Sequence, residues 1–224
     1  MNRREFLTAS VAAGTTTSAT SMAAAGDRKA IKILGISCSP RKGKTTAAAL
    51  TICLEAAQAV PGVTTELIEL AGRNIAVYDP ADPKAGQGGF AELIPILADP
   101  TVGGIIVGTP VYMGNLTSLG KAFFDHGVVF RRDKFALRGK VGGAVAVGAA
   151  RNGGVEFALR SVQAWMLCQS MMVVGDGEPT SHYGAALVND GKDSIANDDI
   201  GIATAKNLGR HVATVALRLA RTGS

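Results

Sequence analysis

A loop rich in hydroxyl and basic side chains follows an apolar stretch near the start of the chain. Residues 32–37 suit a buried parallel strand and residues 47–59 suit a helix, so a helix N-terminus lies between them. The first turn of a helix has unpaired N–H groups and the positive end of the helix dipole, which together favour bound anions. Hydroxyl and cationic side chains add donors for the same anion. We therefore predict a phosphate-binding loop with these candidate ligands: Ser37, Ser39, Arg41, Lys44, Thr45 and Thr46.

Two kinds of phosphate ligand remain open for this segment, which we call the phosphate loop (residues 37–46). As a nucleoside-triphosphate loop of the form G-x-x-x-x-G-K-[ST], it lacks only the first glycine, where Cys38 stands. A magnesium-dependent NTPase would also present an Asp after a second apolar strand, whereas residues 103–110 end in Thr and Pro. Flavin mononucleotide (FMN) needs no magnesium-binding Asp, because hydroxyls, N–H groups and basic side chains suffice to bind its phosphate. FMN is the favoured ligand, and a P-loop NTPase is an alternative.

The elements predicted along the chain alternate between strand and helix. Five strands are expected at 31–37, 64–70, 102–108, 141–148 and 171–175, and helices at 45–59, 90–98, 116–130, 155–170 and 200–220. This alternation predicts an α/β fold in which a doubly wound parallel sheet lies between two layers of helices. Ligands of such sheets bind beyond the carboxyl ends of the strands, where the winding reverses.

Two further loops carry side chains suited to a heteroaromatic ligand. With a strand order of 2-1-3-4-5, both lie beside the phosphate loop in one cleft. The Tyr112 loop offers a rigid turn, an aromatic ring and a soft thioether through Pro110, Val111, Tyr112, Met113, Gly114 and Asn115. The Arg151 loop (residues 149–154) offers backbone amides and a guanidinium at a helix start through Arg151, Asn152 and Gly153.

Composition limits the class of protein. A chain of 224 residues that is 47% hydrophobic and 18% charged is long enough for one domain with a continuous core. The net charge of +5 is not concentrated in a lysine-rich block and aromatics make up only 5%, so we expect no nucleic-acid partner. No apolar run reaches the roughly 18 residues that a transmembrane helix needs. A mildly basic surface suits small molecules that carry phosphate.

The N-terminus resembles a twin-arginine export signal. Arg3 and Arg4 precede a weakly hydrophobic segment and a run of alanines at 23–25. We therefore expect residues 1–28 to be a leader and residues 29–224 to be the folded domain. The protein would be exported already folded, to the periplasm, or would stay in the cytoplasm if the signal is not functional.

Several segments together resemble one family. The chain is similar to the iron-sulfur flavoproteins, within the NADPH-dependent FMN reductase and flavodoxin-like superfamily, in residues 35–46, 110–115, 121–148, 151–156 and 165–176. The resemblance implies a flavodoxin-like fold that binds FMN, as a homodimer or homotetramer with the flavin near a subunit interface. By the matching motifs, the phosphate loop would hold the FMN phosphate. The Tyr112 loop would border the isoalloxazine, and the Arg151 loop would close the cleft on its other side.

The cysteines depart from that family. Its iron-sulfur members carry a compact cysteine cluster in a region that corresponds to residues 71–89, which here contain no cysteine. The chain has only three, Cys38, Cys53 and Cys168, whereas such a cluster uses about four thiolates, so we expect no iron-sulfur cluster. Cys38 is either a small side chain that fits the turn or a thiol whose pKa is lowered beside the helix N-terminus. Cys53 and Cys168 are expected in the core, and their pairing after export stays open.

No side-chain set for acid/base or metal chemistry stands out. The histidines have no metal-ligand spacing and are expected to be solvated or capping: His126, His182 and His211. No catalytic side chain is therefore assigned, and a bound flavin would carry the chemistry. We expect an FMN-dependent oxidoreductase that passes electrons from NAD(P)H, or another small or protein donor, to a quinone-like or other small acceptor. A non-enzymatic electron carrier is the alternative, since NAD(P)H is scarce outside the cytoplasm.

Overall fold

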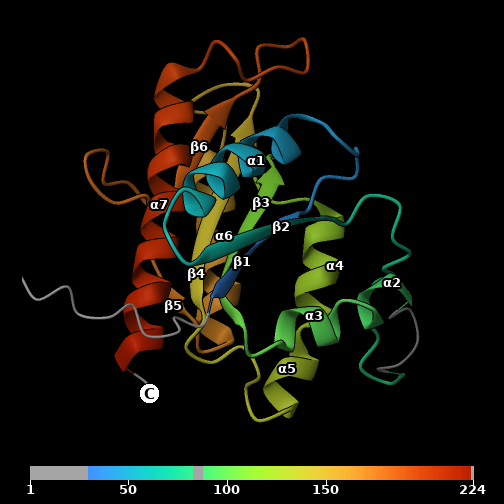
Figure 1. Cartoon of the computed structure of the whole chain (residues 1–224). Helices are drawn as coiled ribbons and strands as arrows, with labels where there is room; N and C mark the ends of the chain where they lie inside the picture. Colours follow the sequence, from blue (N-terminus) through green and yellow to red (C-terminus); the bar gives the residue numbers. More distant parts are fainter. Residues whose placement is uncertain (1–29, 83–87, 223–224) are drawn as a thin grey trace, which may run out of the picture.

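A five-position parallel sheet forms the centre of the protein (Figure 1). The structure, a computed structural model, describes residues 30–82 and 88–222, so the predicted leader lies outside the described residues. The sheet has the order β2-β1-β3-β4-β5, which confirms the predicted order. Its strands are β1 (Ile31–Ser37), β2 (Val63–Glu69), β3 (Val102–Pro110), β4 (Val141–Gly148) and β5 (Met172–Val173).

The fifth position of the sheet differs from the prediction because two short strands share it. β5 pairs with the first two residues of β4, and β6 (Ala185–Val188) pairs with the last four, both in parallel. The sequence predicts no strand between residues 176 and 199, where a polar loop is expected, and the structure corrects this with β6. Four residues are too few for a clear strand pattern, and the pairing partner of β6 is distant in sequence.

Helices cover both faces of the sheet. One face packs against α1 and α7, and residues of the other helices pack on the opposite face, where they form a second core. Figure 1 shows α7 running along the length of the sheet beside α1. Gly209 permits this close approach, because a Cβ at that position would overlap the carbonyl oxygen of Cys53. The helices are α1 (Thr45–Gln58), α2 (Gly88–Ala91), α3 (Ile94–Ala98), α4 (Ser118–His126), α5 (Val128–Arg132), α6 (Val155–Cys168) and α7 (Asp199–Thr222).

Two predicted helices are each divided in the structure. The expected helix at 90–98 is replaced by α2 and α3, with a proline in the first turn of α3. The expected helix at 116–130 is interrupted at Gly127, which separates α4 from α5. Side chains of α6 bind carbonyl groups at this break, because Trp165 Nε1 donates to Phe124 O at 3.1 Å and Gln169 Nε2 donates to Gly127 O at 3.1 Å. A glycine also leaves room there for the Trp165 indole, whose Nε1 would lie 2.8 Å from a Cβ.

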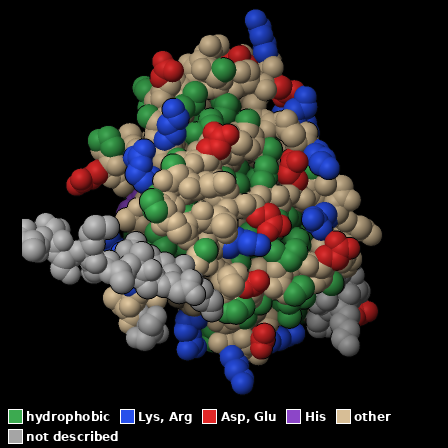
Figure 2. Space-filling view, viewed as in Figure 1, with side chains coloured by type: hydrophobic (Ala, Val, Ile, Leu, Met, Phe, Trp, Pro, Cys, Tyr) green, Lys and Arg blue, Asp and Glu red, His purple; other side chains and the backbone are tan. Residues whose placement is uncertain are grey.

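The surface carries charges of both signs. On the face drawn in Figure 2, lysine and arginine side chains lie among aspartate and glutamate side chains. That mixture agrees with the absence of a basic block in the sequence. Among the helices of the described residues, none is both long and apolar enough to cross a bilayer.

Candidate functional site

The phosphate loop connects the carboxyl end of β1 to the first turn of α1. Ser39 is buried and its Oγ accepts from the backbone N–H of Arg41 at 3.1 Å, which shapes the turn. Gly43 has a φ of +64°, a conformation that favours glycine. The N-cap of α1 is Lys44, and no side chain caps the helix, so first-turn N–H groups stay free of a side-chain acceptor. Thr45 and Thr46 are buried in that turn.

Carboxylates already lie against the donors of this loop. Glu69 Oε2 accepts from the backbone N–H of Gly43 at 2.7 Å. Arg41 Nη1 lies 2.7 Å from Asp193 Oδ1, and Lys44 Nζ lies 3.2 Å from Asp193 Oδ2. Hydrogen bonds from these two cations lower the pKa of the Asp193 carboxyl below its usual value. The loop thus has the donors and the positive charge that a phosphate group requires.

Ser37 is the predicted phosphate ligand that lies deepest. It is the last residue of β1 and is fully buried. Its hydroxyl has no hydrogen-bond partner among the described residues. A buried hydroxyl without a partner is unusual in a folded protein. Together with the uncapped start of α1, it makes the donor set of the phosphate loop a fit for a phosphate-bearing ligand such as FMN.

The Tyr112 loop presents apolar side chains at the surface. Its turn is closed by two backbone hydrogen bonds between Tyr112 and Asn115, at 2.8 and 3.1 Å, and Met113 and Gly114 have positive φ values of 50° and 80°. Tyr112 is 45% exposed and Met113 is fully exposed. Val111 is half-buried, and its N–H donates to Val147 O at 2.9 Å. An exposed ring beside a thioether is a surface that a flat heteroaromatic ligand would cover.

Thr117 connects the phosphate loop to the start of α4. Its Oγ1 donates to Cys38 O at 2.6 Å and accepts from the N–H of Gly120 at 3.0 Å, which caps α4. Its own N–H donates to Thr109 Oγ1 at 3.3 Å, at the end of β3. Thr117 was not among the predicted site residues. A threonine directly before a helical segment is an N-cap signal that could have identified it.

The Tyr112 loop and the Arg151 loop are in backbone contact. Gly154 has a φ of +96°, and a Cβ on it would lie 2.9 Å from Gly114 Cα. A side-chain bond adds to this contact, because Ser161 Oγ donates to Asn115 Oδ1 at 2.7 Å. Asn152 and Gly153 are exposed at the rim of the loop.

A fourth segment, the Asp193 loop (residues 189–198), completes the site. Its Asp193 pairs with the phosphate loop, as described above. Its Asp198 pairs with Arg151, whose guanidinium also lies 3.4 Å from Ala186 O. Asp198 is buried and caps α7 by accepting from the N–H of Gly201 at 3.0 Å. Thr117, just after the Tyr112 loop, provides the remaining link through Cys38 O. With it, the four loops form a closed ring of contacts at the carboxyl edge of the sheet, which we call the loop ring.

Comparison with known proteins identifies the family of this chain. The family model described as NADPH-dependent FMN reductase matches residues 31–186. The chain belongs to the NADPH-dependent FMN reductase family. An iron-sulfur flavoprotein of Methanocaldococcus jannaschii is 40% identical over 198 residues, which are 83% of this chain and 97% of the relative. An NAD(P)H dehydrogenase (quinone) of Chromohalobacter salexigens is 31% identical over 76% of this chain and 92% of the relative.

Solved structures agree with the fold of this FMN reductase family member. A flavodoxin, WrbA-like protein from Agrobacterium tumefaciens has a TM-score of 0.60 at 18% identity and covers 84% of this chain and 98% of its own. An NADH:FMN oxidoreductase in its apo form has a TM-score of 0.60 at 24% identity, over 83% of this chain and 89% of its own. At these identities the likeness shows the flavodoxin-like fold alone. The predicted fold class is thereby confirmed.

The cysteines of this family member are not equivalent to one another. Cys38 is fully buried, and burial raises the pKa of its thiol to about 12, so the alternative of a lowered pKa is wrong. Cys53 is buried as predicted, whereas Cys168 is exposed, which corrects its predicted place in the core. All three are free, and Cys53 packs with α7 on one face of the sheet while α6, which ends at Cys168, packs on the other. The sheet thus separates the two residues whose pairing had been left open.

The histidines also differ from expectation in one case. His126 is buried, with Nε2 3.0 Å from Ala76 O and its ring 5.3 Å from that of Phe90, so its predicted solvation is wrong. His182 is exposed beside the buried carboxylate of Asp176. Among residues 30–82 and 88–222, no three His, Cys, Asp or Glu side chains gather as a metal site would require.

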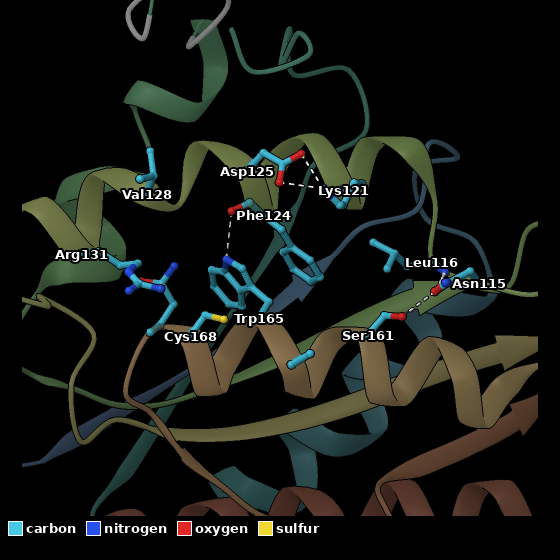
Figure 3. Close-up of a pocket in the computed structure, with 12 residues that line it drawn as sticks. Asn115, Leu116, Lys121, Phe124, Asp125, Val128, Arg131, Ser161, Trp165 and Cys168 are labelled. Atoms are coloured by element: carbon cyan, nitrogen blue, oxygen red, sulfur yellow. Dashed lines mark hydrogen bonds and ion pairs between the residues drawn. The ribbon is translucent and has the colours of Figure 1, made fainter. Parts of the chain in front are cut away.

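A groove of about 660 Å³ adjoins the Tyr112 loop at Asn115 (Figure 3). It runs between α4 and α5 on one side and α6 on the other. The rings of Phe124 and Trp165 stack in its wall with centroids 4.7 Å apart. Lys121 and Arg131 also line it. The groove is therefore largely apolar and aromatic, with cations among its lining side chains.

Proposed function

We propose that the loop ring binds FMN and that this protein is an FMN-dependent oxidoreductase. The observation that carries the proposal is the phosphate loop, whose cations and N–H groups already bind carboxylates while a buried hydroxyl beside them has no partner. Membership of the FMN reductase family supports FMN over the nucleoside triphosphate that the sequence left open. Bound FMN would supply hydride and electron transfer.

The chain would bind and orient the cofactor. The predicted phosphate ligands would be donors to the FMN phosphate: Ser37, Ser39, Arg41, Lys44, Thr45 and Thr46. Tyr112 and Met113 are exposed, and together with the rest of their loop they would border the isoalloxazine and exclude water from it. The Arg151 loop, in contact with Gly114, would close the opposite side.

For the acceptor, we propose a planar, quinone-like molecule. The groove beside Asn115 supports this proposal, because stacked aromatic rings in its wall suit a flat apolar ligand. Relatives from at least three organisms carry the name NAD(P)H dehydrogenase (quinone), which supports both a quinone acceptor and an NAD(P)H donor. If the leader directs export, a quinol or a protein would replace NAD(P)H as the donor.

Assembly, export and the absence of a cluster are parts of the same proposal. We expect a homodimer or homotetramer, and the exposed apolar side chains of Met113 and Phe157 support a surface that another subunit covers. Residues 1–28 would direct export through the paired arginines at 3 and 4. The flavin would work without an iron-sulfur cluster, since the sequence has only three cysteines and two of them are buried.

The visible absorption spectrum of the purified protein tests the cofactor, with the released molecule identified by mass. We expect a flavin spectrum and FMN. The double variant Arg41→Ala with Thr45→Val should lose most of the flavin, whereas Lys42→Ala should keep it, because Lys42 forms no ion pair with any described residue. A colourless protein that FMN cannot reconstitute would contradict the proposal and favour the NTPase. Steady-state oxidation of NAD(P)H then separates an enzyme from an electron carrier, which would accept electrons rapidly only from a protein partner.

A further inference from the structure

The Asp193 loop holds one carboxylate against both cations of the phosphate loop. Asp193 Oδ1 binds Arg41 and Asp193 Oδ2 binds Lys44, so each oxygen has its own cation. A phosphate group would be expected to use the same two cations through two of its oxygens. The carboxylate therefore occupies the positions of an anionic ligand, although it belongs to a segment that lies outside the residues matched by the family model.

The loop presents this carboxylate through its own hydrogen bonds. Asp190 Oδ1 accepts from the N–H groups of Lys192 at 2.8 Å and Ser194 at 3.2 Å, and the N–H of Asp190 donates to Ser194 O at 2.9 Å. Between them, Asp193 has a φ of +59°, which aspartate and asparagine tolerate better than most residues. The conformation of Asp193 is thus set within the loop, and its ion pairs are an additional interaction.

The ion pairs themselves are open to exchange. The side chains of Arg41, Lys44 and Asp193 are 46%, 45% and 35% exposed. Exposed pairs of this kind contribute little, because water and salt screen the charges. A phosphate monoester carries a charge of about −1.5 to −2 at pH 7 and would attract the same cations more strongly than one carboxylate does.

We propose that Asp193 is an internal competitor for the phosphate of the flavin and thereby sets the affinity of this protein for FMN. Binding of the phosphate requires Asp193 to release at least one of its two cations, or to remain nearby as a repelling charge. In both cases the carboxylate weakens the binding of a phosphate-bearing flavin and leaves a phosphate-free flavin unaffected. This inference rests on the proposed function, since it needs FMN in the loop ring.

The test compares the dissociation constants of FMN and riboflavin for the apoprotein at low salt. Asp193→Asn removes the charge and keeps the shape, and Asp193→Gly suits the positive φ while it removes the side chain. Both variants should bind FMN about two- to five-fold more tightly than the wild type, which is the range expected for exposed ion pairs, and riboflavin equally well. The gain should shrink as salt is added.

Glu66→Gln is the matched control. Glu66 pairs with Lys32 at 3.1 Å, and the two side chains are 42% and 35% exposed, so the variant changes the net charge equally without removing a partner of Arg41 or Lys44. It should leave the FMN constant unchanged. The inference would be overturned if the Asp193 variants bound FMN no more tightly than the wild type. It would also be overturned if riboflavin binding to these variants, or FMN binding to Glu66→Gln, gained as much. If the folded wild type binds no FMN at all, the proposed function fails as well, and the two failures are thereby distinguished.

Discussion

Asp193 and Asp198 belong to one loop, and each pairs with a basic side chain of a different predicted flavin loop. The Asp198 side chain is only 7% exposed, and besides Arg151 it accepts from the N–H groups of Val188 at 2.7 Å and Gly201 at 3.0 Å. The Asp193 side chain is 35% exposed and is bound by Arg41 and Lys44 alone among the groups described above. Burial and backbone donors make the first carboxylate a part of the fold. Exposure leaves the second free to exchange its partners.

Replacement of Asp198 should have the largest effect of the changes that test this comparison. Asp198→Ala leaves the buried N–H of Gly201 and the part-buried N–H of Val188 without their acceptor and removes the cap of α7, so we expect a loss of about 2–3 kcal/mol in the free energy of unfolding. Asp193→Asn should leave it nearly unchanged, because water and salt screen its exposed ion pairs. Urea unfolding of both variants measures the difference. Equal losses would mean that burial does not separate the two carboxylates.

The Asp193 loop is the part of the site that the sequence did not predict. The apolar runs of β1 and β4 predicted both strands with the bounds that the structure has, and turn residues pointed to three of the four loops. Asp193 lies 152 positions from Arg41 in a polar segment whose local pattern is that of any loop. Nothing in its neighbourhood indicates a partner so distant, because an ion pair between loops depends on how the sheet places both ends.

The burial of His126 and the exposure of Cys168 differ from the prediction for a related reason. The sequence predicted the helices that contain His126 and Cys168, but not which side chains face the core. His126 packs against Phe90, which the structure places in the separate helix α2. Cys168 is the last residue of α6, beyond the buried residues of that helix. The predicted loops, whose places depend on strand order, lie side by side in the structure. The burial of His126 and Cys168 depends instead on how the helices pack, which the local pattern does not indicate.

Gly154 and Gly191 allow a second comparison, between a glycine that contacts another backbone and one with open space around it. The expected loss of stability is smaller than for Asp198→Ala. Gly154 and Gly191 both have positive φ values, of +96° and +82°, but only Gly154 lies against another backbone, that of Gly114. Gly191→Ala should cost about 1 kcal/mol, which is the conformational term alone. Gly154→Ala should cost about 2 kcal/mol and also reduce FMN retention, because the Tyr112 loop must move away. Urea unfolding and the flavin content of the purified variants measure both effects, and identical costs at the two positions would contradict the backbone contact.

Lys140, at the amino edge of the sheet, extends the comparison of buried and exposed charged groups from carboxylates to a buried ammonium group. Its Nζ donates to Asp99 O at 2.7 Å and Val102 O at 2.9 Å, and burial lowers the pKa of its ammonium to about 8. Between pH 8 and the usual value of 10.5, the unfolded chain binds a proton that the folded chain has lost. The free energy of unfolding should therefore rise with pH across that window, and this contribution should be flat below it.

Denaturant unfolding at several pH values between 7 and 11 measures that slope for the wild type and for Lys140→Met. The variant lacks the titrating group and should be less stable, because two carbonyls lose their donor, but it should show a smaller rise with pH. Parallel curves for the two proteins would mean that the pKa of Lys140 is not lowered in the folded state.

The comparison of the exposed thiol with the two buried thiols should have the smallest effect on stability. Cys168 is exposed, whereas Cys38 and Cys53 are buried with raised thiol pKa values, so a thiol reagent at pH 8 should modify one cysteine of the folded protein and all three after unfolding. Modification of Cys168 should change the free energy of unfolding by less than about 0.5 kcal/mol, since its side chain lies at the surface. Mass spectrometry of the labelled protein identifies the site, and Cys168→Ser is the control that should take up no reagent. Rapid labelling of Cys38 would instead require the phosphate loop to open, and it should then slow when FMN is added, because a bound phosphate stabilises the closed loop.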